Sequence, residues 1–287
     1  MKSNDGGSTA PTGDGQPAAV ERLSLNTATV RAGLLETVEA CAAAGVRWIA
    51  PWREQFDGVS VAVAAKAIDA AGLKVSILCR GGFFPAATAA ERAARIDENL
   101  MALDEAATLA AEVLVLVCGG VVGRDLAGSR QMVEDGIAAI LPAAKACGVK
   151  LGIEPLHPMF GADRSVIVTL DQANSLARRL ASPWVGAVID VYHVWWDPEV
   201  EDAIARTGER ILAFHVNDWV VPLVDVLNGR GMMGDGVIDL RRLRRAVDGA
   251  GFGGPIEVEI FNESVRAMGL KPALELVVDR YKKMVLD

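Results

Sequence analysis

Short apolar runs alternate with longer runs rich in Ala, Leu and Glu along most of the chain. The short runs predict strands over residues 23–30, 46–52, 74–80, 113–119, 150–156, 185–193, 211–218 and 256–261. The longer runs predict helices, the clearest of them over residues 34–44, 59–71, 89–111 and 131–147. Near-continuous Val, Ile and Leu in the short runs indicates a parallel sheet that is covered by helices.

The order of these elements predicts one closed barrel. Eight strands with helices between them, in a chain of 287 residues, indicate an α/β fold, a single (β/α)8 TIM barrel over residues 21–287. Residues 1–20 are rich in Gly, Ser, Thr, Pro and Ala, and we expect a flexible N-terminal tail there. A doubly wound open sheet is the alternative, but no Gly-rich dinucleotide fingerprint follows the first predicted strand.

Charge and composition narrow the choice of partner and compartment. The net charge of −8 argues against a nucleic-acid partner, and the basic cluster at residues 241–245 indicates a solvated helix face. The apolar run at residues 113–118 is too short to cross a bilayer, and residues 1–20 lack the features of a secretory signal. Four cysteines without a CxxC spacing indicate buried reduced thiols: Cys41, Cys79, Cys118 and Cys147. We therefore expect a cytoplasmic protein with no membrane partner.

Titratable side chains gather at the predicted carboxyl ends of the last four strands, where barrel enzymes carry their chemistry. All three histidines of the chain fall at such ends: His157, His193 and His215. Glu154 and Asp190 each follow an apolar run, where a buried carboxylate needs a cation or hydrogen bonds. On the last strand Glu257 and Glu259 point to the same side, so either could reach the barrel mouth. Carboxylates with an imidazole suit one Mn²⁺ or Mg²⁺, with Co²⁺ or Zn²⁺ as alternatives.

Four short motifs carry a resemblance to a known family. They are GIEPL at residues 152–156, DVYH at 190–193, FHVND at 214–218 and GPIEVE at 254–259. In this order they resemble the xylose-isomerase-like barrel family, which includes ketose 3-epimerases, inosose isomerases and dehydratases, and endonuclease IV. The resemblance covers the chain from about residue 23 to residue 286. Matched motif by motif, it implies the metal ligands of the sugar-acting members: Glu154, Asp190, His215 and Glu259.

The resemblance also implies a reaction and makes His193 a substrate contact, and positions in the predicted loops add further candidates. Glu154 and Glu259 would be catalytic, removing and returning a proton beside a carbonyl through a metal-stabilised enediolate. The segment 219–236 is long and contains several glycines, which is typical of a lid. The predicted substrate-binding residues lie in this segment and at the strand ends: His193, His157, Arg230, Arg80, Trp52 and Asp218.

These residues predict a divalent-metal-dependent isomerase or epimerase whose partner is a small-molecule keto sugar or related polyol. The main alternative is a lyase or dehydratase that performs β-elimination on a 3-keto sugar, a keto-glycoside or an inosose. A non-catalytic barrel subunit is an alternative of another class, and by analogy we expect a homo-oligomer or a partner subunit. An endonuclease IV-like enzyme is disfavoured, because it needs further histidines where this chain has Trp52, Arg53 and Arg80.

Overall fold

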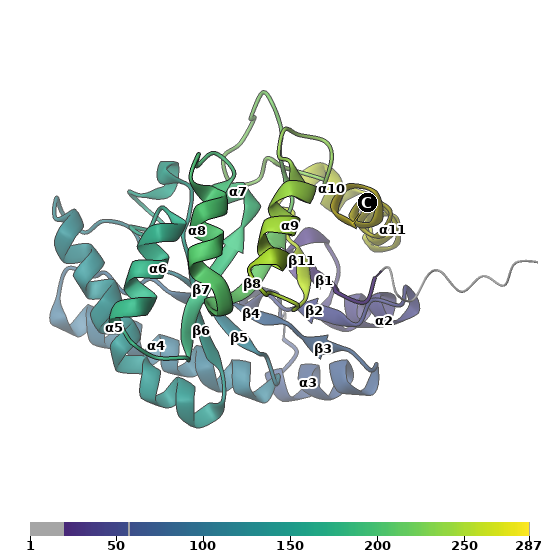
Figure 1. Ribbon diagram of the computed structural model, residues 1–287. Coiled ribbons are helices and arrows are strands. Elements are labelled where there is room, and N and C mark those ends of the chain that lie inside the picture. Colours follow the sequence, from purple (N-terminus) through teal and green to yellow (C-terminus); the bar gives the residue numbers. More distant parts are fainter. Residues whose placement is uncertain (1–19, 57, 287) are drawn as a thin grey trace, which may run out of the picture.

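The predicted strands pair in parallel and close into a barrel (Figure 1). The computed structural model describes residues 20–56 and 58–286. The sheet order is β3-β2-β1-β11-β8-β7-β6-β5-β4. A parallel bridge between Trp52, which follows β2, and Cys79 on β4 closes the sheet at that point. The strands are β1 (Leu23–Asn26), β2 (Trp48–Ala50), β3 (Lys74–Val75), β4 (Ile77–Gly82), β5 (Val113–Val117), β6 (Lys150–Glu154), β7 (Val185–Asp190), β8 (Ile211–Val216) and β11 (Ile256–Val258).

Helices form the outer layer around these strands (Figure 1). They are α2 (Leu34–Ala43), α3 (Val61–Ala70), α4 (Ala89–Thr108), α5 (Leu126–Cys147), α6 (Leu170–Arg179), α8 (Val200–Thr207), α9 (Leu240–Gly249) and α11 (Leu270–Arg280), which continues into the π-helical η5 (Tyr281–Leu286). The shorter helices α7 (Val191–Val194) and α10 (Glu263–Ala267) follow β7 and β11 directly. The predicted single (β/α)8 barrel is therefore confirmed.

Several predicted boundaries were wrong, and local side-chain hydrogen bonds explain two of them. The first strand ends at Asn26, whose side chain accepts a hydrogen bond from the backbone of Ala28 and starts the 3-10 turn η1 (Thr27–Thr29). The helix α5 begins at Leu126 rather than at residue 131, because the side chain of Asp125 caps it by accepting a hydrogen bond from the backbone of Gly128. The predicted strand over residues 74–80 is divided into β3 and β4.

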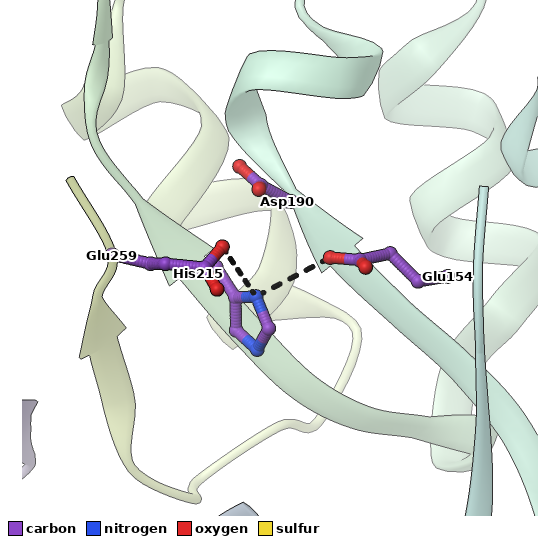
Figure 2. A group of neighbouring side chains, drawn as sticks. All are labelled: Glu154, Asp190, His215 and Glu259. Carbon is purple, nitrogen blue, oxygen red and sulfur yellow. Dashed lines mark ion pairs between the residues drawn. The ribbon is translucent and has the colours of Figure 1, made fainter. Parts of the chain in front are cut away.

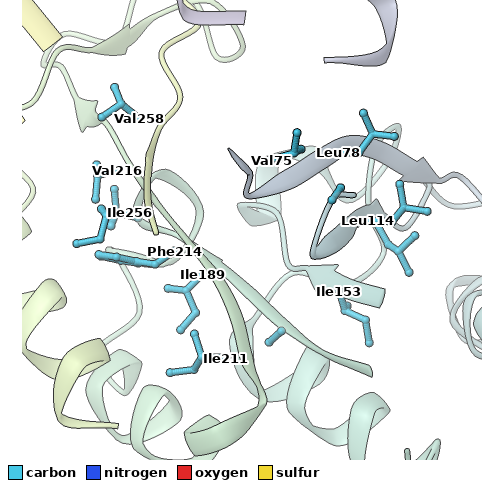
Figure 3. Packing of buried hydrophobic residues seen from close by; sticks show 14 of the residues in the cluster. Val75, Leu78, Leu114, Ile153, Ile189, Ile211, Phe214, Val216, Ile256 and Val258 are labelled. Carbon is cyan, nitrogen blue, oxygen red and sulfur yellow. The ribbon is translucent and has the colours of Figure 1, made fainter. Parts of the chain in front are cut away.

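Alternation along each strand divides the core into two layers. On β5, Leu114 and Leu116 pack outward against the helices, whereas Val113 and Val115 fill the barrel interior. Part of the outer layer, including Leu114 and Phe214, is drawn in Figure 3. The interior is tightly filled: a Cβ atom on Gly152 would lie 2.6 Å from Val188 and 2.8 Å from Val113. The same alternation directs the polar side chains at the strand ends inward.

Three further predictions concern the N-terminal residues, the cysteines and membrane-spanning helices. The predicted tail, residues 1–20, lies outside the described residues except for Val20, which is buried in the core. Cys41, Cys79 and Cys118 are buried free thiols as predicted, whereas Cys147 is exposed near the end of α5. Over the stretches 20–56 and 58–286, no helix is long and apolar enough to cross a membrane.

Candidate metal centre

Four side chains from four neighbouring strands meet at the carboxyl end of the barrel (Figure 2). Glu154 and Asp190 are the last residues of β6 and β7, His215 lies on β8, and Glu259 directly follows β11. Each offers one ligand atom, and these atoms lie within 4.8 Å of one another. All four side chains are buried, so they are held by the barrel rather than by mobile loops. The sequence prediction brought together these same four residues.

The spacing of the group suits a single ion. The Nδ1 atom of His215 lies 3.5 Å from the Oε1 atom of Glu154 and 3.9 Å from the Oε2 atom of Glu259. Ligand atoms about 2 Å from a shared ion lie roughly this far apart. Neither ring nitrogen of His215 has a hydrogen-bond partner among the described residues, although the ring is fully buried. A buried imidazole nitrogen without a partner fits a metal ligand.

The balance of buried charge also indicates a divalent cation. Besides the three carboxylates of the group, Glu257 is buried beside it, which makes four acidic side chains. The buried cationic groups that face them are Arg230 and, when protonated, His215. Burial lowers the pKa of His193 to about 3, so its imidazole stays neutral and adds no positive charge. Four negative charges against at most two positive ones leave at least two to be compensated, which a divalent ion would supply.

Without an ion, protons take over part of this compensation. Burial raises the pKa of Glu259 to about 8, with further repulsion from Glu154 and Asp190 that Arg230 only partly offsets. Burial would lower the pKa of His215, but the carboxylates of Glu257, Glu154 and Glu259 raise it to about 10. A bound cation would displace these protons, because a ligand must present a free lone pair.

Glu257 lies behind the imidazole rather than among the four ligand atoms. Its Oε1 atom is 3.6 Å from the Nε2 atom of His215, on the far side of the ring from Nδ1. Asn26 on β1 donates hydrogen bonds to both Glu257 and Glu259, at 2.8 and 3.0 Å. The sequence left open which of these glutamates reaches the mouth; the structure brings Glu259 into the group and sets Glu257 behind His215.

Two asparagines belong to the centre although the sequence prediction missed them. Asn26 joins the two glutamates of the last strand, and Asn217 donates to Oδ1 of Asp190 at 2.9 Å. Burial alone would raise the pKa of Asp190, but Arg230, His193, His215 and Asn217 lower it to about 2. The position of Asn217, two residues after His215, was the available signal, because alternation directs it to the same side.

Arg230 reaches the centre from the long segment between β8 and α9. It lies on the hairpin of β9 (Asp218–Trp219) and β10 (Arg230–Gly231). Its Nη1 atom is 2.8 Å from Oδ2 of Asp190 and 2.7 Å from Oε2 of Glu259. The guanidinium is held between the rings of Tyr192 and Phe261, each centroid 4.8 Å away. The predicted substrate contact Arg230 is therefore a buried part of the centre.

A cavity of about 290 Å³ opens above the centre. Glu154, Glu259, His193 and Arg230 line it from the metal side. Trp52, Glu54, Arg80, Phe160 and Arg164 also line it. Its volume fits a small molecule of sugar size rather than a polymer. Four of the predicted substrate-binding residues, Trp52, Arg80, His193 and Arg230, thus face one cavity.

The other two predicted substrate-binding residues lie away from the cavity lining. Asp218 is buried, and its carboxylate accepts hydrogen bonds from the backbone of Gly234, Gly236 and Ile238. Asp218 therefore holds the segment 234–238 close to the end of β8, which is a structural role.

His157 caps the short helix η3 (Pro158–Phe160) through the backbone of Met159. Its ring packs against Trp196 and Trp219, at 5.6 and 5.2 Å between centroids. Its backbone N–H, rather than its ring, donates to Nδ1 of His193 at 3.1 Å. His157 thus orients His193 and does not face the cavity.

The fold agrees with comparisons with known proteins. The chain belongs to the xylose isomerase-like TIM barrel family, whose model matches residues 38–281. It is 28% identical over 184 residues to 3-dehydroshikimate dehydratase of Pseudomonas aeruginosa, which covers 61% of this chain and 28% of that protein. The chain thus spans little more than a quarter of the length of the curated relatives it matches.

Solved structures extend the likeness. Protein SMc04130 of Sinorhizobium meliloti 1021 is 48% identical, with a TM-score of 0.90 over 93% of this chain and 99% of that one. The IOLI protein, solved with a zinc atom, is 20% identical, with a TM-score of 0.79 over 93% of this chain and all of its own. D-psicose 3-epimerase of Clostridium cellulolyticum H10 is 14% identical, with a TM-score of 0.72 over 92% and 96% of the two chains. The last two likenesses concern the fold alone.

Proposed function

We propose that this chain is a divalent-metal-dependent isomerase or epimerase that acts on a keto sugar or a related polyol. The observation that carries the proposal is the buried group of Glu154, Asp190, His215 and Glu259 at the floor of a sugar-sized cavity. An ion bound there would stabilise the negative charge that develops on a carbonyl oxygen as the neighbouring carbon loses its proton. Mn²⁺ and Mg²⁺ fit this oxygen-rich set best, and Zn²⁺ or Co²⁺ are alternatives.

In this proposal the protein's own residues bind the substrate and move the proton. Glu154 and Glu259 line the cavity from different strands, so one carboxylate can remove a proton and the other can return one. Arg230 and neutral His193 face the same space and would orient the oxygens of the substrate. Trp52 offers an apolar ring face for a sugar, and Val226 and Leu227 add apolar lining to the cavity.

A lyase or dehydratase is the second candidate, and one observation favours it. The curated relatives that match are named 3-dehydroshikimate dehydratases. β-Elimination begins with the same proton abstraction, and differs in that a hydroxyl or another substituent then leaves the next carbon. The same centre could therefore serve either reaction, and the substrate decides between them.

Two measurements test the proposal in sequence. Mass spectrometry should find about one equivalent of a divalent metal per chain, which the Glu154→Gln, Glu259→Gln double variant loses. The loaded protein should then exchange a carbon-bound hydrogen of a keto sugar with D₂O. Exchange without loss of a substituent supports the isomerase or epimerase, and loss of water or an alcohol supports the lyase. A protein that binds no metal, even in excess ion, would refute both.

A further inference from the structure

Two arginines line the cavity without taking part in the metal centre. Arg230 pairs with Asp190 and Glu259, whereas Arg80 on β4 and Arg164 in the segment before α6 line the same cavity. An arginine that faces a cavity is paired with a carboxylate of the protein, is hydrated, or is available to bind an anion. The partners of these two side chains distinguish these cases.

Arg164 has no neutralising partner in the part of the chain that the structure describes. Its guanidinium makes no ion pair and no hydrogen bond there, although the residue is half-buried. Its backbone is nevertheless fixed: the N–H donates to Phe160 at 3.0 Å, and the carbonyl accepts from Gly119 at 2.7 Å. The guanidinium lies 6.0 Å from the ring of Phe160, which also lines the cavity. Arg164 is thus a positioned cation that lacks a counter-charge.

Arg80 is only weakly neutralised. Its single ion pair is with Glu54, at 3.1 Å, and the side chain of Glu54 is 53% exposed. Ion pairs that are this open to water contribute little, so an incoming anion can replace Glu54. Arg80 also stacks on Phe83, 4.5 Å from the ring centroid, which fixes the plane of its guanidinium. It borders both the cavity above the metal centre and a neighbouring one of about 930 Å³.

We propose that the substrate carries an anionic group, a carboxylate or a phosphate, that Arg164 and Arg80 bind while its carbonyl faces the metal centre. This inference rests on the proposed function. Guanidinium groups only donate hydrogen bonds, and they match the paired oxygens of a carboxylate or phosphate better than a single hydroxyl. A neutral ketose would leave Arg164 without a counter-charge in a half-buried place. The keto substrate is therefore an acid or a sugar phosphate rather than a neutral sugar.

The test uses ligands that cannot undergo the reaction, because they lack the ketone carbonyl beside which a proton would be removed. Isothermal titration calorimetry of the Mn²⁺-loaded protein would compare shikimate with its methyl ester, and glucitol 6-phosphate with glucitol. Each pair differs in its anionic group. The charged member of at least one pair should bind about ten- to a hundredfold more tightly, the range of a charge-assisted hydrogen bond. The shikimate pair reports a carboxylate site, and the glucitol pair a phosphate site.

One variant and a matched control assign the preference to Arg164. Arg164→Gln should remove most of the difference within the pair. Arg178→Gln, on the exposed face of α6, changes the net charge equally and should preserve the difference. Equal binding of charged and neutral members, or a difference that Arg164→Gln leaves intact, overturns the proposal. Hydrogen exchange on a neutral ketose without any charge preference would overturn it while leaving the proposed function standing. A charge preference without metal binding would refute the proposed function alone.

Discussion

The two halves of the barrel differ in the charge that they present to the cavity. The strands β6, β7, β8 and β11 contribute every side chain of the candidate metal group, and all of these are buried. The segment after β2 contributes Trp52 and Glu54, and β4 contributes Arg80; all three side chains are partly open to water. The buried group is suited to binding an ion, whereas Trp52, Glu54 and Arg80 are suited to contacting a ligand in the cavity. Changes at Trp52, Glu54 or Arg80 should therefore act on substrate binding, and changes in the buried group on the metal.

The largest expected effect is the loss of a ligand. Glu154→Gln should weaken metal binding by more than about a hundredfold, because even outer-shell partners of a metal contribute ten- to a hundredfold. Metal content after dialysis measures it, and hydrogen exchange should be lost in parallel. Glu134→Gln is a matched control, because Glu134 pairs with Arg179 on the helical surface. Retention of one equivalent of metal by the Glu154 variant would contradict the assignment.

A smaller effect is expected at Glu257, which contacts the ligand His215 from behind. Glu257→Gln should weaken metal binding by about ten- to a hundredfold, because a carboxylate behind a ligating imidazole orients the ring and raises its basicity. Titration with Co²⁺ measures the affinity, and the visible spectrum of the Co²⁺ form should shift as well. An unchanged affinity and spectrum would show that Glu257 serves only to pack the barrel.

Metal affinity should also depend on pH. The metal-free pKa values of Glu259 and His215, about 8 and about 10, mean that both groups carry protons at pH 6. An ion must displace these protons, so affinity should rise with pH from 6 to 8, by up to about a hundredfold per pH unit when two protons leave. Titration of the apoprotein in buffers of increasing pH measures this slope. A flat profile would contradict the proton count.

The stability of the metal-free protein should change in the opposite direction. Both groups have a higher pKa in the folded than in the unfolded chain, so their contribution is full at low pH and is lost as pH rises through about 8 and about 10. The melting temperature of the apoprotein should therefore fall between pH 7 and pH 9. The loaded protein should resist this fall, because the ion replaces the protons. Differential scanning calorimetry of both forms checks the sign.

The smallest expected effect is at Glu54, on the side of the cavity away from the metal group. Glu54→Gln breaks the ion pair with Arg80, which is partly open to water, and should change the free energy of unfolding by less than about 1 kcal/mol. Metal affinity should remain at the wild-type value, as measured by the same Co²⁺ titration. A loss of metal comparable to that of the Glu257 variant would remove the distinction between the two halves.

Strand geometry predicted the fold and two of the ligands, whereas the complete four-residue group was implied by the family resemblance. In a parallel barrel the carboxyl ends of the strands meet, and side-chain alternation decides which residues point inward. Apolar runs that end in Glu154 or Asp190 therefore located two ligands without any knowledge of the packing. The prediction failed for His157 and Asp218, because polar residues at a strand end also cap turns and fasten loops.

By itself, then, the sequence determined the barrel, its strand ends and the kind of ion that they suit, since these follow from local periodicity and ligand chemistry. Alternation could not decide which glutamate of the last strand joins the group, because Glu257 and Glu259 point to the same side; the resemblance implied Glu259, and the tertiary structure sets Glu257 behind His215. The tertiary structure also decided that Arg230 is buried between Asp190 and Glu259, whereas Arg164 lacks a counter-charge in the described structure. The partners of both arginines depend on how long loops fold back over the barrel, and no local pattern encodes that path.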